Sequence, residues 1–112
     1  MRLVSRRTIR EFVDSLAGHK DQQAVRSALL AWAAQVEVAD WASGADVRRD
    51  YATASLVGAE RVVFNVKGND YRLVAAIDYR PLARSVWIKW IGTHAEYDRI
   101  DVRTIEHRRQ GS

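Results

Sequence analysis

Six polar side chains in the second half of the chain carry groups that phosphodiester chemistry requires. Four of them lie in strand-like segments or at the end of one: Asn65, Lys67, Arg72 and Lys89. Two more, His94 and Tyr97, follow the last of these segments. Guanidinium and ammonium groups bind phosphate oxygens, and an imidazole transfers protons near neutral pH. The combination indicates a protein that acts on a phosphodiester.

Alternation of apolar and polar residues predicts three β-strands that position these groups, over residues 61–67, 71–78 and 86–91. We expect the more apolar set to face the helices: Val62, Phe64, Val66, Leu73, Ile77, Val86, Ile88 and Trp90. The opposite face then collects the four cationic and amide residues: Asn65, Lys67, Arg72 and Lys89. A register shift of one residue would invert this assignment for a strand. The turn between the first two strands is predicted at residues 67–70, where Gly and Asn tolerate positive φ.

The first half of the chain predicts helices, because its apolar residues recur at intervals of three and four. These helices are expected over residues 5–17, 21–41 and 43–51. Residues 2–4 predict a short first strand, and residues 52–60 lack periodicity and are expected to be a connector. The elements together predict an α+β fold, with N-terminal helices packed on one face of a mainly antiparallel sheet.

Length and composition predict a single domain over residues 1–112, in which the polar residues 107–112 form a frayed tail. The chain has 18 Lys and Arg against 14 Asp and Glu, and the net charge of +4 favours a polyanionic partner. It has no cysteine, which excludes disulfides and cysteine-ligated metals. No apolar run has the length of a signal-peptide core or a membrane span, so we expect a cytoplasmic protein without a membrane partner.

Three motifs resemble the HigB family of toxins from bacterial toxin–antitoxin pairs, within the RelE-like superfamily. They are VFNVKGN at residues 63–69, YRL at 71–73 and IGTHAEYD at 91–98. The helical half is similar in kind, with a helix around Trp32 followed by the sequence ADW at residues 39–41. The resemblance spans nearly the whole chain, and the two longer motifs together are specific.

The resemblance implies a RelE-like ribonuclease architecture and an endoribonuclease that cuts messenger RNA, commonly on the translating ribosome. It also implies a cognate HigA-type antitoxin that silences the toxin. Cleavage without metal or other cofactor would use the RNA 2′-hydroxyl as nucleophile. The protein must then move two protons and stabilise the transition-state charge.

Roles for individual residues follow from their chemistry. Arg72 is expected to bind the reacting phosphate, because its planar guanidinium donates to two oxygens at once. His94 is expected to be the general acid or base, and Tyr97 to donate a proton, position the phosphate or stack on a base. Further contacts to RNA are expected from Asn65, Lys67 and Lys89. The spacing of His94, Glu96 and Asp98 matches no strong metal signature, so no metal site is expected.

Two other functions fit the same residues. A non-catalytic RNA-binding module would need the basic face but not His94. A protein-interaction toxin would use the basic face for an acidic partner, since related superfamily members poison gyrase without cutting RNA. Which of the catalytic groups is the acid and which the base is left open by the sequence.

Overall fold

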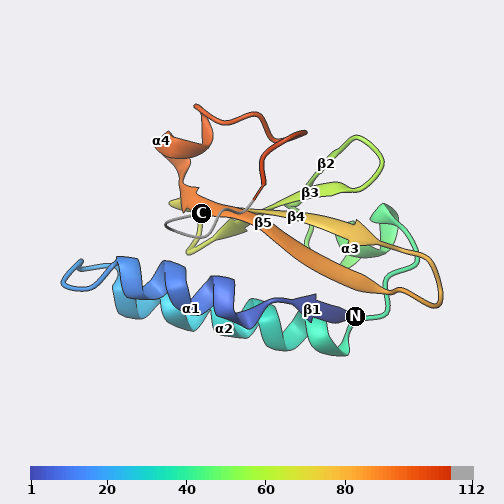
Figure 1. Ribbon diagram of the computed structural model, residues 1–112, viewed down its shortest axis with the longest axis horizontal. Helices are drawn as coiled ribbons and strands as arrows, with labels where there is room; N and C mark the ends of the chain where they lie inside the picture. Colours follow the sequence, from blue (N-terminus) through green and yellow to red (C-terminus); the bar gives the residue numbers. More distant parts are fainter. Residues whose placement is uncertain (107–112) are drawn as a thin grey trace.

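A β-sheet built mainly by the second half of the chain organises the structure (Figure 1). This computed structural model describes residues 1–106, and the predicted frayed tail at residues 107–112 lies outside them. In chain order the elements are β1 (Arg2–Val4), α1 (Arg6–Ser15), α2 (Gln22–Val38), α3 (Gly44–Asp50), β2 (Ser55–Val57), β3 (Arg61–Val66), β4 (Tyr71–Asp78), β5 (Ser85–Thr93) and α4 (His94–Tyr97).

The strands of the sheet lie in the order β1-β5-β4-β3-β2. All neighbouring pairs are antiparallel except β1 and β5, which are parallel. This confirms the predicted α+β fold. The prediction of a connector over residues 52–60 was wrong in part, because β2 forms there and pairs with β3. Its three residues are too few for alternation to be visible, and their pairing is set by the neighbouring strand.

The long helices α1 and α2 lie side by side along the sheet and cover one of its faces (Figure 1). The core between the layers is aromatic at its centre. Trp32 on α2 meets Phe64 on β3 edge to face, with ring centroids 5.3 Å apart, and Trp41 stacks on Phe64 at 6.3 Å. Within residues 1–106, no helix combines the length and apolarity needed to cross a membrane.

A β-bulge in β5 changes which side chains face the helices. Val74 pairs with Trp90 and Ala75 with Ile88, so Lys89 is an extra residue in β5. Trp90 therefore lies on the same face as Arg72, and Ile91 packs against the core in its place. The prediction that Trp90 faces the helices was wrong, because one inserted residue inverts the alternation beyond it.

The second face of the sheet is also covered along much of its length. Residues 99–106 return across it, on the side opposite α1 and α2 (Figure 1). Arg61 is only 8% exposed on this face and donates to the Ile105 carbonyl at 2.6 Å and to Glu106 at 3.1 Å. Toward the β3–β4 hairpin, Asn65 and Arg72 on this face are partly exposed, whereas Val63, Val74 and Ala76 further along it are buried.

Candidate active site

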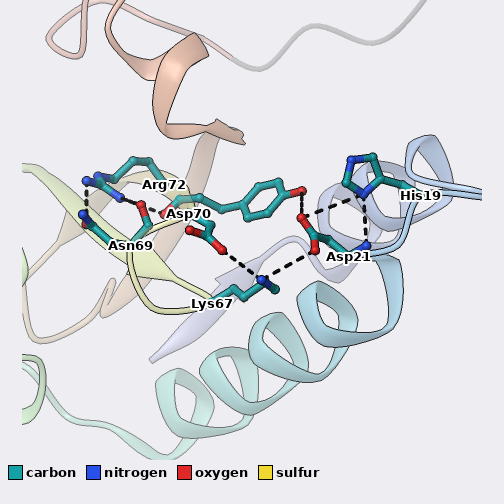
Figure 2. Close-up of polar contacts among 7 residues, drawn as sticks. His19, Asp21, Lys67, Asn69, Asp70 and Arg72 are labelled. Carbon is teal, nitrogen blue, oxygen red and sulfur yellow. Dashed lines mark hydrogen bonds and ion pairs between the residues drawn. The ribbon is translucent and has the colours of Figure 1, made fainter.

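Arg72 lies on the second face of the sheet near the β3–β4 hairpin, where it is partly exposed. Its register partners are Asn65 on β3 and Gly92 on β5, so these three residues share one face. The guanidinium donates to the Asn69 backbone carbonyl at 2.9 Å, to the Asn69 side-chain oxygen at 2.8 Å and to the Tyr71 carbonyl at 3.2 Å (Figure 2). These acceptors are neutral, and no carboxylate among residues 1–106 forms an ion pair with Arg72. The side chain is held in place while its charge is left available to an anion.

Two aromatic rings continue the surface beside Arg72. The Arg72 Cζ atom lies 5.9 Å from the centroid of the Tyr97 ring, and that ring lies 6.4 Å from the Trp90 ring. We call Arg72, Trp90 and Tyr97 the Arg72 cluster. A cation and two rings on one surface suit a nucleotide, because the bases stack on rings while the guanidinium binds phosphate.

Gly92 makes room for the Arg72 cluster. A Cβ atom at this position would lie 2.4 Å from the Trp90 indole and 3.0 Å from a Glu96 carboxylate oxygen. The backbone φ of Gly92 does not require glycine, so the need for a hydrogen at this position is steric. The indole packs directly over the strand backbone as a result.

We therefore expect Gly92→Ala to lower the free energy of unfolding by about 1–3 kcal/mol, because the added methyl overpacks against the indole. Gly44→Ala is the matched control. The three atoms nearest to its Cβ would all belong to the side chain of Leu56, which is 44% exposed and can rotate, so the change should be below about 0.5 kcal/mol. Urea unfolding curves for both variants measure the difference, and equal effects would contradict this account of Gly92.

His94 begins α4 directly after β5. Thr93 and Glu96 form a reciprocal capping box, in which the Thr93 hydroxyl accepts from the Glu96 amide at 3.1 Å and Glu96 accepts from the Thr93 amide at 2.8 Å. The His94 amide donates to the Asp70 carbonyl at 2.9 Å. The start of α4 is thus tied to the same turn that holds Arg72, and the exposed imidazole lies at this end of the sheet. Glu96 is occupied by capping rather than by the imidazole.

Lys67 lies apart from Arg72. Its ammonium donates to Asp70 at 2.8 Å and lies 3.6 Å from Asp21, at the start of α2 (Figure 2). The hydrogen bond to Asp70 raises the pKa of Lys67, and the charge of Asp21 raises it further. The Tyr71 hydroxyl donates to the same Asp21 at 3.2 Å. The expected common face therefore holds Asn65 and Arg72 but not Lys67, which the turn carries toward the helices.

Lys89 lies at the bulge, and its ammonium donates to Glu106 at 2.8 Å. Glu106 also accepts from the buried Arg61, so one carboxylate joins two cations of the sheet. The hydrogen bond from Lys89 lowers the pKa of Glu106, and the charges of Lys89 and Arg61 act in the same direction. Lys89 is on the predicted face, but its charge is paired and it lies toward the covered half.

A pH dependence of stability follows from Glu106. Folding lowers the pKa of Glu106, so its carboxylate stabilises the folded chain at pH values above its unfolded pKa of ~4.3. This stabilisation is lost as the pH falls through the lower pKa of the folded state. At pH 7 the free energy of unfolding of wild type should exceed that of Glu106→Gln by about 0.2–1 kcal/mol. The difference is small because the Glu106 side chain is 55% exposed and solvent screens its ion pairs. Urea unfolding at pH 7 and pH 3 measures this; a gap between wild type and variant that does not narrow in acid would contradict the assignment.

Sequence reasoning missed three residues of the site. Asn69, treated only as a turn former, supplies two of the acceptors that hold Arg72. Trp90 was assigned to the core, and Gly92 carried no assigned role. The Asn-x-x-Arg spacing across the hairpin was an available signal for the first. Among residues 1–106, no group of three or more His, Cys, Asp or Glu side chains could hold a metal ion.

The fold and the site define a small α+β protein in which an anchored arginine, without a carboxylate partner among residues 1–106, lies beside the Tyr97 ring at the same end of the sheet as an exposed histidine. A family model for HigB toxins, described as the RelE-like toxic component of a toxin–antitoxin system, matches residues 25–100. The match covers more than half of the chain, and the chain belongs to this family. It is therefore a toxin of a toxin–antitoxin system, as the motifs predicted, and its family implies a cognate antitoxin. A comparison with curated proteins finds no match.

Proposed function

We propose that this toxin is a metal-independent endoribonuclease that cuts messenger RNA on the translating ribosome, in the cytoplasm, until a HigA-type antitoxin silences it. One observation carries the proposal. The Arg72 guanidinium is fixed by neutral acceptors, has no carboxylate partner among residues 1–106, and lies at the same end of the sheet as Tyr97 and His94. A preorganised cation of this kind stabilises charge that develops on a phosphate.

The reaction would balance within the RNA itself. The ribose 2′-oxygen attacks the adjacent phosphorus and loses its proton to a base, while the bond from phosphorus to the 5′-oxygen breaks and that oxygen gains a proton. The products are a 2′,3′-cyclic phosphate and a free 5′-hydroxyl. Arg72 would bind the non-bridging oxygens, and His94 and Tyr97 would be the groups that move protons.

Binding of the substrate would use the remaining groups on the same face. Trp90 and Tyr97 offer surfaces for base stacking, and Asn65, opposite Arg72, offers an amide to a base edge or ribose. Lys67 and Lys89 are proposed as contacts to neighbouring phosphates. We expect their contribution to be smaller than that of Arg72, because both ammonium groups are ion-paired with carboxylates.

The difference between the cations gives a prediction. Lys67→Ala should reduce cleavage less than about tenfold, because RNA must compete with Asp70 and Asp21 for this ammonium. The measurement is the cleavage rate with programmed ribosomes at two salt concentrations. A loss with Lys67→Ala as large as that with Arg72→Ala would show that the hairpin rearranges to bring both cations to one phosphate.

Mapping of transcript 5′ ends after brief induction tests the function itself. Cuts are expected within translated codons of a reporter transcript and not in a matched transcript whose start codon is removed. Equal cutting of both transcripts would contradict the dependence on the ribosome. RNA binding without any new 5′ ends, or a block of replication before transcripts are lost, would contradict the nuclease.

A further inference from the structure

Within residues 1–106, one edge of β5 is unpaired over most of its length. β5 runs from Ser85 to Thr93, but β1 pairs only with residues 85–87. In the part of the chain that the structure describes, no strand pairs with residues 88–93 on the side away from β4. An exposed strand edge presents backbone donors and acceptors that another extended chain can pair with.

This free edge lies in a groove between two other parts of the chain. A cavity of about 1070 Å³ is lined by Phe12 and Ser15 of α1 on one side and by Ile100 and Ile105 on the other, with residues 89–91 of β5 between them. The groove is open along the free edge. Five partly buried apolar side chains line it: Phe12, Trp90, Ile91, Ile100 and Ile105. They suit a segment with apolar residues at alternate positions.

The charge of the groove differs from that of the rest of the chain. Four carboxylates line it, from Glu11, Asp14, Asp101 and Glu106, against the two cations Lys89 and Arg99. Glu11 is ion-paired with Arg7, and Glu106 with Lys89 and Arg61, so the negative charge available to a partner comes mainly from Asp14 and Asp101. The whole chain, in contrast, carries a net charge of +4. An acidic groove repels RNA and favours a protein segment that carries Lys or Arg beside its apolar residues.

We propose that the cognate antitoxin inserts an extended segment into this groove and pairs with residues 88–93 as a further strand of the sheet. The free edge of six residues is about 20 Å long at the usual rise per residue, enough for a short strand held by main-chain hydrogen bonds. Apolar side chains of the segment contact Phe12 and Ile91, and basic ones contact the acidic rim. The proposal rests on family membership and not on RNA cleavage, so it stands or falls separately from the nuclease activity.

The groove and the Arg72 cluster share one residue. Trp90 lines the groove and its ring also contacts the Tyr97 ring. An antitoxin strand at the edge would therefore restrain the Trp90 side chain. Through the contact of Trp90 with Tyr97 it would alter the Arg72 cluster without covering Arg72. This placement leaves the RNA-binding face free of the antitoxin segment.

The test measures amide exchange of the full-length toxin by NMR, alone and bound to its purified cognate antitoxin. We expect at least tenfold slower exchange for edge amides within residues 88–93 in the complex. We also expect at least tenfold weaker antitoxin binding for Ser15→Trp, which fills the groove, and for Asp14→Lys, which reverses its rim. Asp40→Lys is the matched charge control. Its side chain is 85% exposed and does not line the groove, so binding should be unchanged.

Three results would overturn the proposal. Protection confined to Arg72, His94 and Tyr97 would mean that the antitoxin covers the active site directly. Equal weakening by Asp14→Lys and Asp40→Lys would mean that basic residues of the antitoxin do not bind at this groove. Edge protection that grows with toxin concentration in the absence of antitoxin would assign the groove to a second copy of the toxin. Circular dichroism of each variant confirms folding before binding is measured.

Discussion

Arg72→Ala is expected to lower the rate of messenger-RNA cleavage by about 10²–10³-fold, the usual cost of removing one preorganised donor to transition-state charge. Cells that produce the variant should grow normally and keep intact transcripts. The reason is geometric, because the guanidinium is fixed by Asn69, lies beside Tyr97 and has no carboxylate partner among residues 1–106. The measurement is single-turnover cleavage of a defined transcript on purified ribosomes.

Two controls separate charge from geometry and from folding. Arg72→Lys keeps the charge but loses the planar fork, so its rate should fall between those of wild type and Arg72→Ala. Arg10→Ala removes an exposed arginine from α1, far along the chain from the site, and should leave the rate unchanged. Because Arg72 also bonds the hairpin turn, thermal unfolding of each variant must show a folded chain. A folded Arg72→Ala variant that cleaves at the wild-type rate would remove the basis of the proposed mechanism.

The long elements of the fold were predictable because each was long enough to show its period. The apolar stripe of residues 5–17 and the alternation of residues 61–66 both come from packing against one core, and both formed as expected. β2 was missed although β1, also a strand of three residues at an edge, was predicted; strands this short carry too little alternation to be told reliably from a connector. The C-terminal segment over the second face was also missed, since its attachment depends on Arg61 meeting Glu106 across 45 positions.

The candidate site was predictable where side chains alternate regularly between the two faces of a strand. The prediction failed where a turn or a bulge interrupts this alternation. Asn65 and Arg72 are direct register partners, so alternation alone placed them together. Lys67 continues the same parity in the sequence, but its φ of 52° turns it out of the strand toward Asp21. The bulge at Lys89 places Trp90 on the same face of the sheet as Arg72. No residue type in β5 predicts a bulge at this position. Parity is thus reliable only between turns and bulges, and active sites are often built at both.

His94→Ala should lower cleavage by about 10²–10⁴-fold, the range for loss of a general acid or base. The imidazole is exposed at the start of α4, and its backbone is tied to Asp70 in the turn that also carries Asn69. Cleavage rates measured from pH 5 to pH 9 on programmed ribosomes should change with pH in wild type over a range in which the rate of the variant stays constant. A purely structural role for His94 would lower the rate at every pH and leave the shape of the profile intact.

Substitution by glutamine sharpens this prediction. His94→Gln keeps a polar side chain of similar reach that can hydrogen-bond but does not transfer a proton, so it should be as slow as His94→Ala if proton transfer is the role. His19→Ala is the control for loss of an imidazole elsewhere. His19 accepts from the Asp21 amide on the helix side of the molecule, away from Arg72, and its removal should change neither rate nor pH profile (Figure 2). If His94→Gln instead retains the wild-type rate, His94 only positions the RNA, and Tyr97 becomes the remaining proton-transfer group beside Arg72.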